Sequence, residues 1–138
     1  MLFNISNKRK SDWKLDIDGV EKGGCTVEDV EKLLDSIGNG KIYFIVLTPA
    51  KKVDVNSRRL NFVQICRDES DDNYHFEVST SDVNDSDNIV IYGKGGFAKD
   101  KVTDMVQLLM KDEIVPDCSG WEVVFDSADV KIANVEVY

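Results

Sequence analysis

Residues that could carry out hydrolytic chemistry form a short pattern in the last quarter of the chain. Pro116-Asp117 is followed, after eleven intervening residues, by Asp129-Val130-Lys131. Two carboxylates can hold a divalent ion while a lysine stabilises the transition state, as in metal-dependent nucleases. The pattern is short, however, and Pro116 is also explained as a helix stop. A small metal-dependent nuclease using Asp117, Asp129 and Lys131 is therefore kept as an alternative function.

Two further patterns imitate ligand-binding loops but fail at defining positions. Gly93-Lys94-Gly95-Gly96 precedes a predicted helix, yet a phosphate loop requires G-x-x-x-x-G-K followed by Ser or Thr. Asp82-x-Asn84-x-Ser86 begins like a calcium loop, but Asp87 stands where that loop needs glycine. We therefore predict neither a metal nor a cofactor.

The single histidine, His75, has no cysteine or histidine partner at the spacing of zinc ligands. It alternates with Tyr74 and Phe76 along a predicted strand, so its side chain falls on the opposite face from theirs. We predict a surface histidine with no catalytic role.

The stretch from Asn88 to Phe125 is the unit that must position these groups. Ile89–Tyr92 is β-branched and aromatic, which predicts a buried strand, and the glycines at 93–96 predict a turn after it. A helix follows, with Asp100 as its N-cap and Pro116 beyond its end. Its apolar stripe is Val102, Met105, Val106, Leu108 and Leu109. Trp121–Phe125 is predicted to return as a strand.

The first half of the chain predicts one further helix among strands. Alternation from Trp13 to Ile17 indicates a strand. Thr26 caps a helix whose apolar stripe runs from Val27 to Ile37. The continuous apolar run at 41–47 is typical of a strand covered on both faces. Residues 60–66 and 74–80 form a predicted hairpin, and residues 130–137 a last strand.

The order of these elements favours one domain over residues 1–138. Strands in succession with few helices indicate an α+β fold, an antiparallel-rich sheet of about six strands packed against two helices. Three cysteines without a C-x-x-C pair indicate reduced thiols. No apolar run approaches the ~20 residues that span a bilayer, and the first residues lack the charge order of a secretory signal, so we expect a cytoplasmic protein without membrane contact.

Charge is unevenly distributed and predicts the kind of partner. The net charge of −9 argues against nucleic-acid binding, which depends on lysine and arginine at phosphates. Between residues 67 and 88, eight acidic residues are opposed only by Arg67. The predicted partner-binding residues are Asp68, Glu69, Asp71, Asp72, Asp82, Asp85 and Asp87. The alternative is that these residues merely form two solvated loops. Lys94 with Phe97 offers another contact surface.

From Leu15 to Val124 the chain resembles the first-numbered family of bacterial immunity proteins, which accompany polymorphic toxins. The resemblance lies in Thr26-Val27-Glu28-Asp29-Val30 with Leu33-Leu34, a strand ending at Leu47-Thr48, Gly95-Gly96, the second helix and Trp121-Glu122. It implies a protein that binds and blocks a toxin, as in contact-dependent growth inhibition, and that has no catalytic residues.

Together these observations predict an immunity protein that neutralises a cognate toxin by stoichiometric occlusion. A nuclease or deaminase toxin is favoured over a pore-forming one, because acidic loops can imitate phosphate in a basic substrate groove. A generic protein-interaction module is the second alternative.

Overall fold

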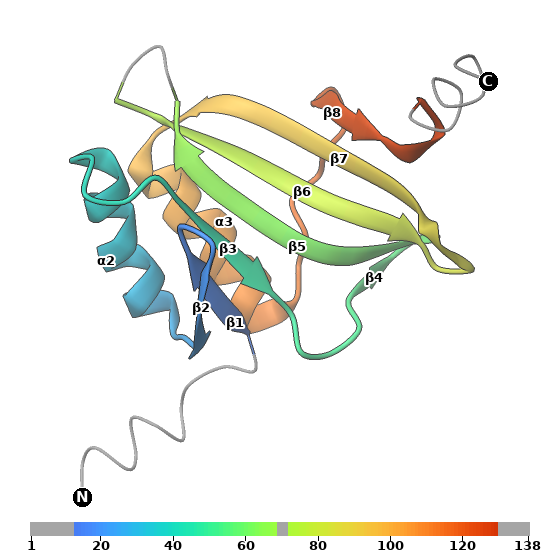
Figure 1. The fold of residues 1–138 in the computed structure, drawn as a ribbon, viewed down its shortest axis with the longest axis horizontal. Coiled ribbons are helices and arrows are strands. Elements are labelled where there is room, and N and C mark those ends of the chain that lie inside the picture. Colours follow the sequence, from blue (N-terminus) through green and yellow to red (C-terminus); the bar gives the residue numbers. More distant parts are fainter. Residues whose placement is uncertain (1–12, 69–71, 130–138) are drawn as a thin grey trace, which may run out of the picture.

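The computed structural model describes residues 13–68 and 72–129, which form an antiparallel sheet carrying two helices (Figure 1). The strands are β1 (Lys14–Ile17), β2 (Val20–Gly24), β3 (Phe44–Thr48), β4 (Asp54–Val55), β5 (Arg58–Arg67), β6 (Tyr74–Asp82), β7 (Asp85–Phe97) and β8 (Glu122–Asp126). The helices are α2 (Val27–Gly38) and α3 (Lys99–Asp112). The predicted α+β class is confirmed, and the sheet has eight strands where about six were expected.

The spatial order of the sheet is β2-β1-β3-β5-β6-β7-β8, with β4 paired to the start of β5. Every neighbouring pair is antiparallel, and β5, β6 and β7 form a meander of long strands. The predicted hairpin of residues 60–66 and 74–80 is part of that meander. The predicted strand at 130–137 lies outside the described residues.

Helix α2 begins where the sequence predicts. The Thr26 hydroxyl accepts a hydrogen bond from the Asp29 amide (3.1 Å), and the Asp29 carboxylate accepts one from the Thr26 amide (2.9 Å). This capping box satisfies two amides that otherwise lack partners in the first turn. Val30, Leu34 and Ile37 are buried against the sheet, as the stripe predicts.

Helix α3 corrects two predictions. Its N-cap is Ala98, which makes no side-chain capping bond, and Asp100 lies inside the first turn. Leu108 is 45% exposed, whereas Met110 is buried. Leu108 falls off the stripe because it is rotated by about 100° from Leu109 on a helix with 3.6 residues per turn.

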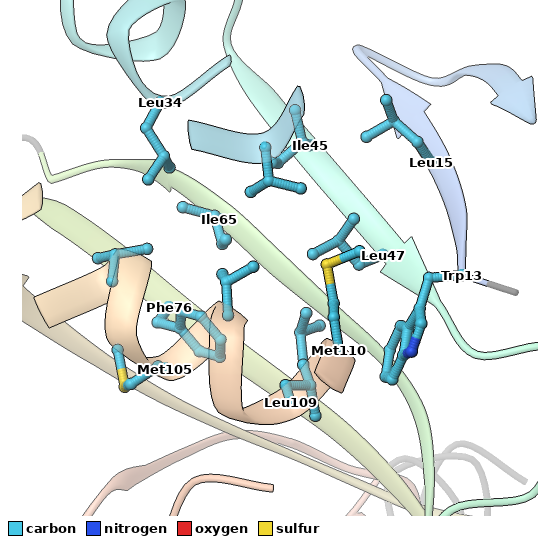
Figure 2. Packing of buried hydrophobic residues seen from close by; sticks show 14 of the residues in the cluster. Trp13, Leu15, Leu34, Ile45, Leu47, Ile65, Phe76, Met105, Leu109 and Met110 are labelled. Carbon is cyan, nitrogen blue, oxygen red and sulfur yellow. The ribbon is translucent and has the colours of Figure 1, made fainter. Parts of the chain in front are cut away.

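The hydrophobic core lies between the two helices and one face of the sheet (Figure 2). Leu34 of α2 and Leu109 of α3 contribute to it from the helices, Ile65 and Phe76 contribute from the sheet, and all four are fully buried. The prediction that the strand at 41–47 is covered on both faces is wrong. Ile45 and Leu47 are buried while Phe44 and Val46 are half-buried, because both helices lie on one face.

The predicted glycine turn before α3 is also wrong, because β7 continues through Gly93, Gly95 and Gly96. A register shift near the end of β7 pairs Tyr74 with Phe97 and Phe76 with Lys94, and this bulge takes up the extra residue. Ile89–Tyr92 was expected to be buried but is only half-buried, because both helices lie on the same face of the sheet. No helix of the described residues has the length and apolar content to cross a membrane.

Candidate functional site

The predicted acidic residues lie at opposite ends of strand β6. Asp68 and Asp72 precede its first residue, Tyr74, and Asp82 ends it. Tyr74 and Asp82 are eight steps apart in extended chain, so at about 3.3 Å per residue β6 separates the two groups by roughly 26 Å. Glu69 and Asp71 lie outside the described residues. The acidic residues therefore form two separate surfaces, one at each end of the meander (Figure 1).

We call Asp82, Asp85 and Asp87 the acidic tip. Asp82 ends β6, and Asp85 and Asp87 lie at the start of β7, after the turn that joins the two strands. The carboxylate of Asp82 accepts a hydrogen bond from the Asn84 amide (2.8 Å), and that of Asp85 accepts one from the Asp87 amide (3.1 Å). Asp85 and Asp87 are exposed, and Asp82 is half-buried. Within residues 13–68 and 72–129, no ion pair neutralises any of the three.

Arg58 holds the base of the hairpin that carries the acidic tip. Its guanidinium donates to the hydroxyl and carbonyl oxygens of Thr80 (3.2 and 3.1 Å) and to the side-chain and main-chain oxygens of Asn88 (2.7 and 3.3 Å). The Val83 amide donates to the Ser57 carbonyl oxygen (3.0 Å), which ties the turn to the loop between β4 and β5. These bonds fix the orientation of the three aspartates in advance of any encounter with a partner.

The acidic group at the other end of β6 is partly used inside the protein. The Asp68 carboxylate accepts a hydrogen bond from the Gly96 amide (2.6 Å), and Asp72 pairs with Arg67 (3.3 Å). A Cβ at Gly95 would collide with the Asp68 carboxylate, so glycine at this position lets the bulge of β7 approach that side chain. Lys94 lies nearby, its Nζ 5.7 Å from the centre of the Phe97 ring.

His75 is a half-buried residue of the sheet. Its Nε2 lies 3.1 Å from an oxygen of Glu77, and a Cβ at Gly93 would stand 3.0 Å from the same nitrogen. Cys66 is its cross-strand neighbour in the register. No group of three or more histidine, cysteine or acidic side chains in the described residues has metal-binding geometry.

Asp117, one of the residues of the nuclease alternative, caps a local turn. Its carboxylate accepts hydrogen bonds from the Ser119 hydroxyl (2.7 Å) and amide (3.0 Å). These two bonds, the hydroxyl bond first, hold the pKa of Asp117 below its ordinary value. Asp129 lies beyond β8, and Lys131 lies outside the described residues, so the nuclease alternative stays a prediction.

The segment between α3 and β8 borders a groove of about 710 Å³. Its floor is formed by Val78, Thr80 and Tyr92, and its walls by residues 55–58 and 115–121. Cys118 in the wall is half-buried, and burial raises the pKa of its thiol to about 11. Because the thiol is protonated at neutral pH, this cysteine is not an activated nucleophile.

Strand β8 contains a surface that the sequence analysis missed. Val123, Val124 and Phe125 are 50%, 41% and 39% exposed. β8 pairs with β7 on one side, and no other described strand pairs with its outer side. The sequence analysis predicted a returning strand here, and the sequence carries no signal that this strand lies at an edge.

Comparison with protein-family models, with characterised proteins and with solved structures finds no match to this chain.

Proposed function

We propose that this protein is an immunity protein, which neutralises a bacterial toxin by binding to it in equimolar amounts and covering its working surface. The observation that supports this most directly is the acidic tip, a group of three aspartates with two exposed members, no neutralising ion pair in the described chain and an internally bonded base. The sequence resemblance of residues 15–124 to toxin immunity proteins points the same way.

A rigid acidic projection is suited to a basic partner. Charged side chains at the rim of an interface mainly raise the association rate and select partners of the opposite sign. Toxins that act on nucleic acids need a basic substrate groove, so a nuclease or deaminase domain is the favoured partner. The net charge of −9 adds long-range attraction to such a surface.

The proposal predicts that a toxin domain is encoded beside this gene, and the test uses that domain. Purified protein should abolish the activity of that domain at an equimolar ratio. The variant Asp85→Asn/Asp87→Asn should slow association by about ten-fold at low salt and weaken its salt dependence, since two exposed charges are lost. Glu31→Gln/Asp104→Asn removes two exposed charges from the helices and is the matched control.

Two results would contradict the proposal. The first is full activity of the toxin domain in the presence of an equimolar amount of the protein, and the second is metal-dependent cleavage of nucleic acid by the purified protein itself. If the two double variants behaved alike, the function would stand but the acidic tip would not be its contact surface. Asp72→Asn then tests the opposite end of β6.

A further inference from the structure

Among the strands that the structure describes, β8 is the last at its end of the sheet. Within residues 13–68 and 72–129 no strand pairs with its outer side, so alternate main-chain amide and carbonyl groups face outward there. Its side chains are Glu122, Val123, Val124, Phe125 and Asp126, and the three apolar ones are each at least 39% exposed. An apolar edge of this kind is a template for the addition of another strand.

The opposite edge of the sheet differs in ways that discourage such pairing. Strand β2 contains Glu21 and Lys22 followed by two glycines, and Gly23 has a φ of +85°. A register shift in β1 beside it interrupts the ladder. Charges, glycines and irregular pairing protect sheet edges from strand addition. β8 also has charged ends and a register shift against β7 beside Val124, but its centre is apolar and contains no glycine, so the two edges are not equivalent.

The charges of β8 select the kind of strand that can pair with it. In a β8–β8 pair related by a two-fold axis at Val124, Glu122 of each copy would lie opposite Asp126 of the other copy. Directly opposed like charges destabilise a strand pair. A strand with an apolar centre and lysine or arginine at both ends instead pairs opposite charges at each end of β8.

The acidic tip lies beyond one end of this edge. Asp126 pairs with Val90 of β7, and Asp87 is three residues before Val90, about 10 Å along the strand. The Ile89 amide donates to the Ser127 hydroxyl (2.9 Å), which keeps the end of β8 against β7 on the side of the tip. A basic residue at that end of an added strand lies beside Asp126, at the end of β8 that is nearer the acidic tip.

We propose that β8 is a docking edge for an extended segment of a partner protein, an apolar strand flanked by basic residues that adds to the sheet as a ninth strand. This inference rests on the proposed function in one respect, which is that the toxin is the partner protein that supplies the strand.

The first test asks whether the edge can pair and whether charge controls it. Glu122→Lys places opposite charges at both ends of a two-fold β8–β8 pair, so this variant should dimerise. Sedimentation should show a dimer at concentrations at which the native protein is a monomer, and high salt should reverse it. Glu31→Lys makes the same charge change on α2 and should remain a monomer. If Glu122→Lys stays monomeric at every concentration, the edge does not pair and the proposal fails.

The second test uses a defined probe, the peptide Lys-Val-Thr-Val-Thr-Val-Lys, with a glutamate-ended version and an N-methylated version as controls. The native protein should bind the lysine-ended peptide at least ten times more tightly than either control, with slower hydrogen exchange of β8 amides. Equal binding of all three peptides would refute the proposal. Dimerisation of the native protein through β8 would also refute it, because a second copy would then occupy the edge. So would peptide binding that appears only after removal of residues 130–138, because those residues would then be the occupant.

Toxin neutralisation separates this inference from the proposed function. If the native protein neutralises the toxin and Glu122→Lys does so equally well, the docking edge is wrong and the function stands. If no toxin is neutralised but the peptide and dimer results hold, the function is wrong and the edge stands.

Discussion

Replacement of Trp121 by alanine should destabilise the protein, because this side chain fastens the segment between α3 and β8 to the core. Trp121 is half-buried, and its ring meets Phe76 edge-on at a centroid distance of 6.2 Å and Phe97 at 5.7 Å. Phe76 is fully buried at the centre of the sheet, while Phe97 ends β7. One ring thus joins the core, the end of β7 and the start of β8.

The expected magnitude follows from these contacts. Truncation of a fully buried tryptophan or phenylalanine to alanine costs about 3–5 kcal/mol. Partial exposure lowers that figure, and each aromatic pair accounts for about 0.5–1.5 kcal/mol of it. We expect Trp121→Ala to lower the free energy of unfolding by about 2–3 kcal/mol. For a domain of this size the melting temperature then falls by roughly 10 °C.

Urea titration followed by circular dichroism measures the change, with two variants as controls. Trp121→Phe keeps a ring against Phe76 and should cost about 1 kcal/mol. Val124→Ala truncates a 41% exposed side chain on β8, which follows Trp121, and should change stability by less than about 0.5 kcal/mol. If Trp121→Ala were as stable as Val124→Ala, the aromatic contacts would not be what secures β8.

Two further changes test the helix start and the thiol in the groove wall. Thr26→Ala removes half of the capping box and should lower the free energy of unfolding by about 1 kcal/mol in a urea titration. Thr26→Ser should retain most of the stability. If the two variants lost the same free energy of unfolding, the hydroxyl bond to Asp29 would contribute nothing. The pKa of Cys118 is raised to about 11 from the ordinary value of 9.0, so at pH 8 it carries roughly a hundredth of the usual thiolate. A thiolate of higher pKa is intrinsically more nucleophilic, which recovers about ten-fold of the lost alkylation rate. Peptide-resolved alkylation should therefore be about ten times slower at Cys118 in the native protein than in urea, and its rate should still rise between pH 9 and 11; a plateau by pH 9 would contradict the raised pKa.

Local patterns in the sequence were sufficient for the elements whose cause is local. Thr26 and Asp29 lie three residues apart, so a capping box can be predicted without knowledge of the rest of the chain. The same holds for the buried stripe of α2 and for the hairpin of β5 and β6, where the side-chain period shows which residues share a face.

Predictions that depended on the surroundings of an element were less secure. The glycines at 93–96 resemble a turn locally, but pairing with β6 holds them in a strand with a bulge. Likewise, the apolar run around Ile45 fits a strand covered on both faces, yet both helices cover the same face. A short apolar run has the same appearance in a one-sided and a two-sided sheet, so only the packing decides.

By itself, the sequence determined the α+β class, the acidic character and the start of α2, because each follows from composition or from residues a few positions apart. The sequence also placed the acidic residues in two loops on either side of the strand at 74–80, and the tertiary structure showed that the extended strand β6 separates them by roughly 26 Å. Only the tertiary structure placed β8 at the edge of the described sheet. Strand order is set by contacts between residues distant in the chain, and no local pattern in this sequence records them.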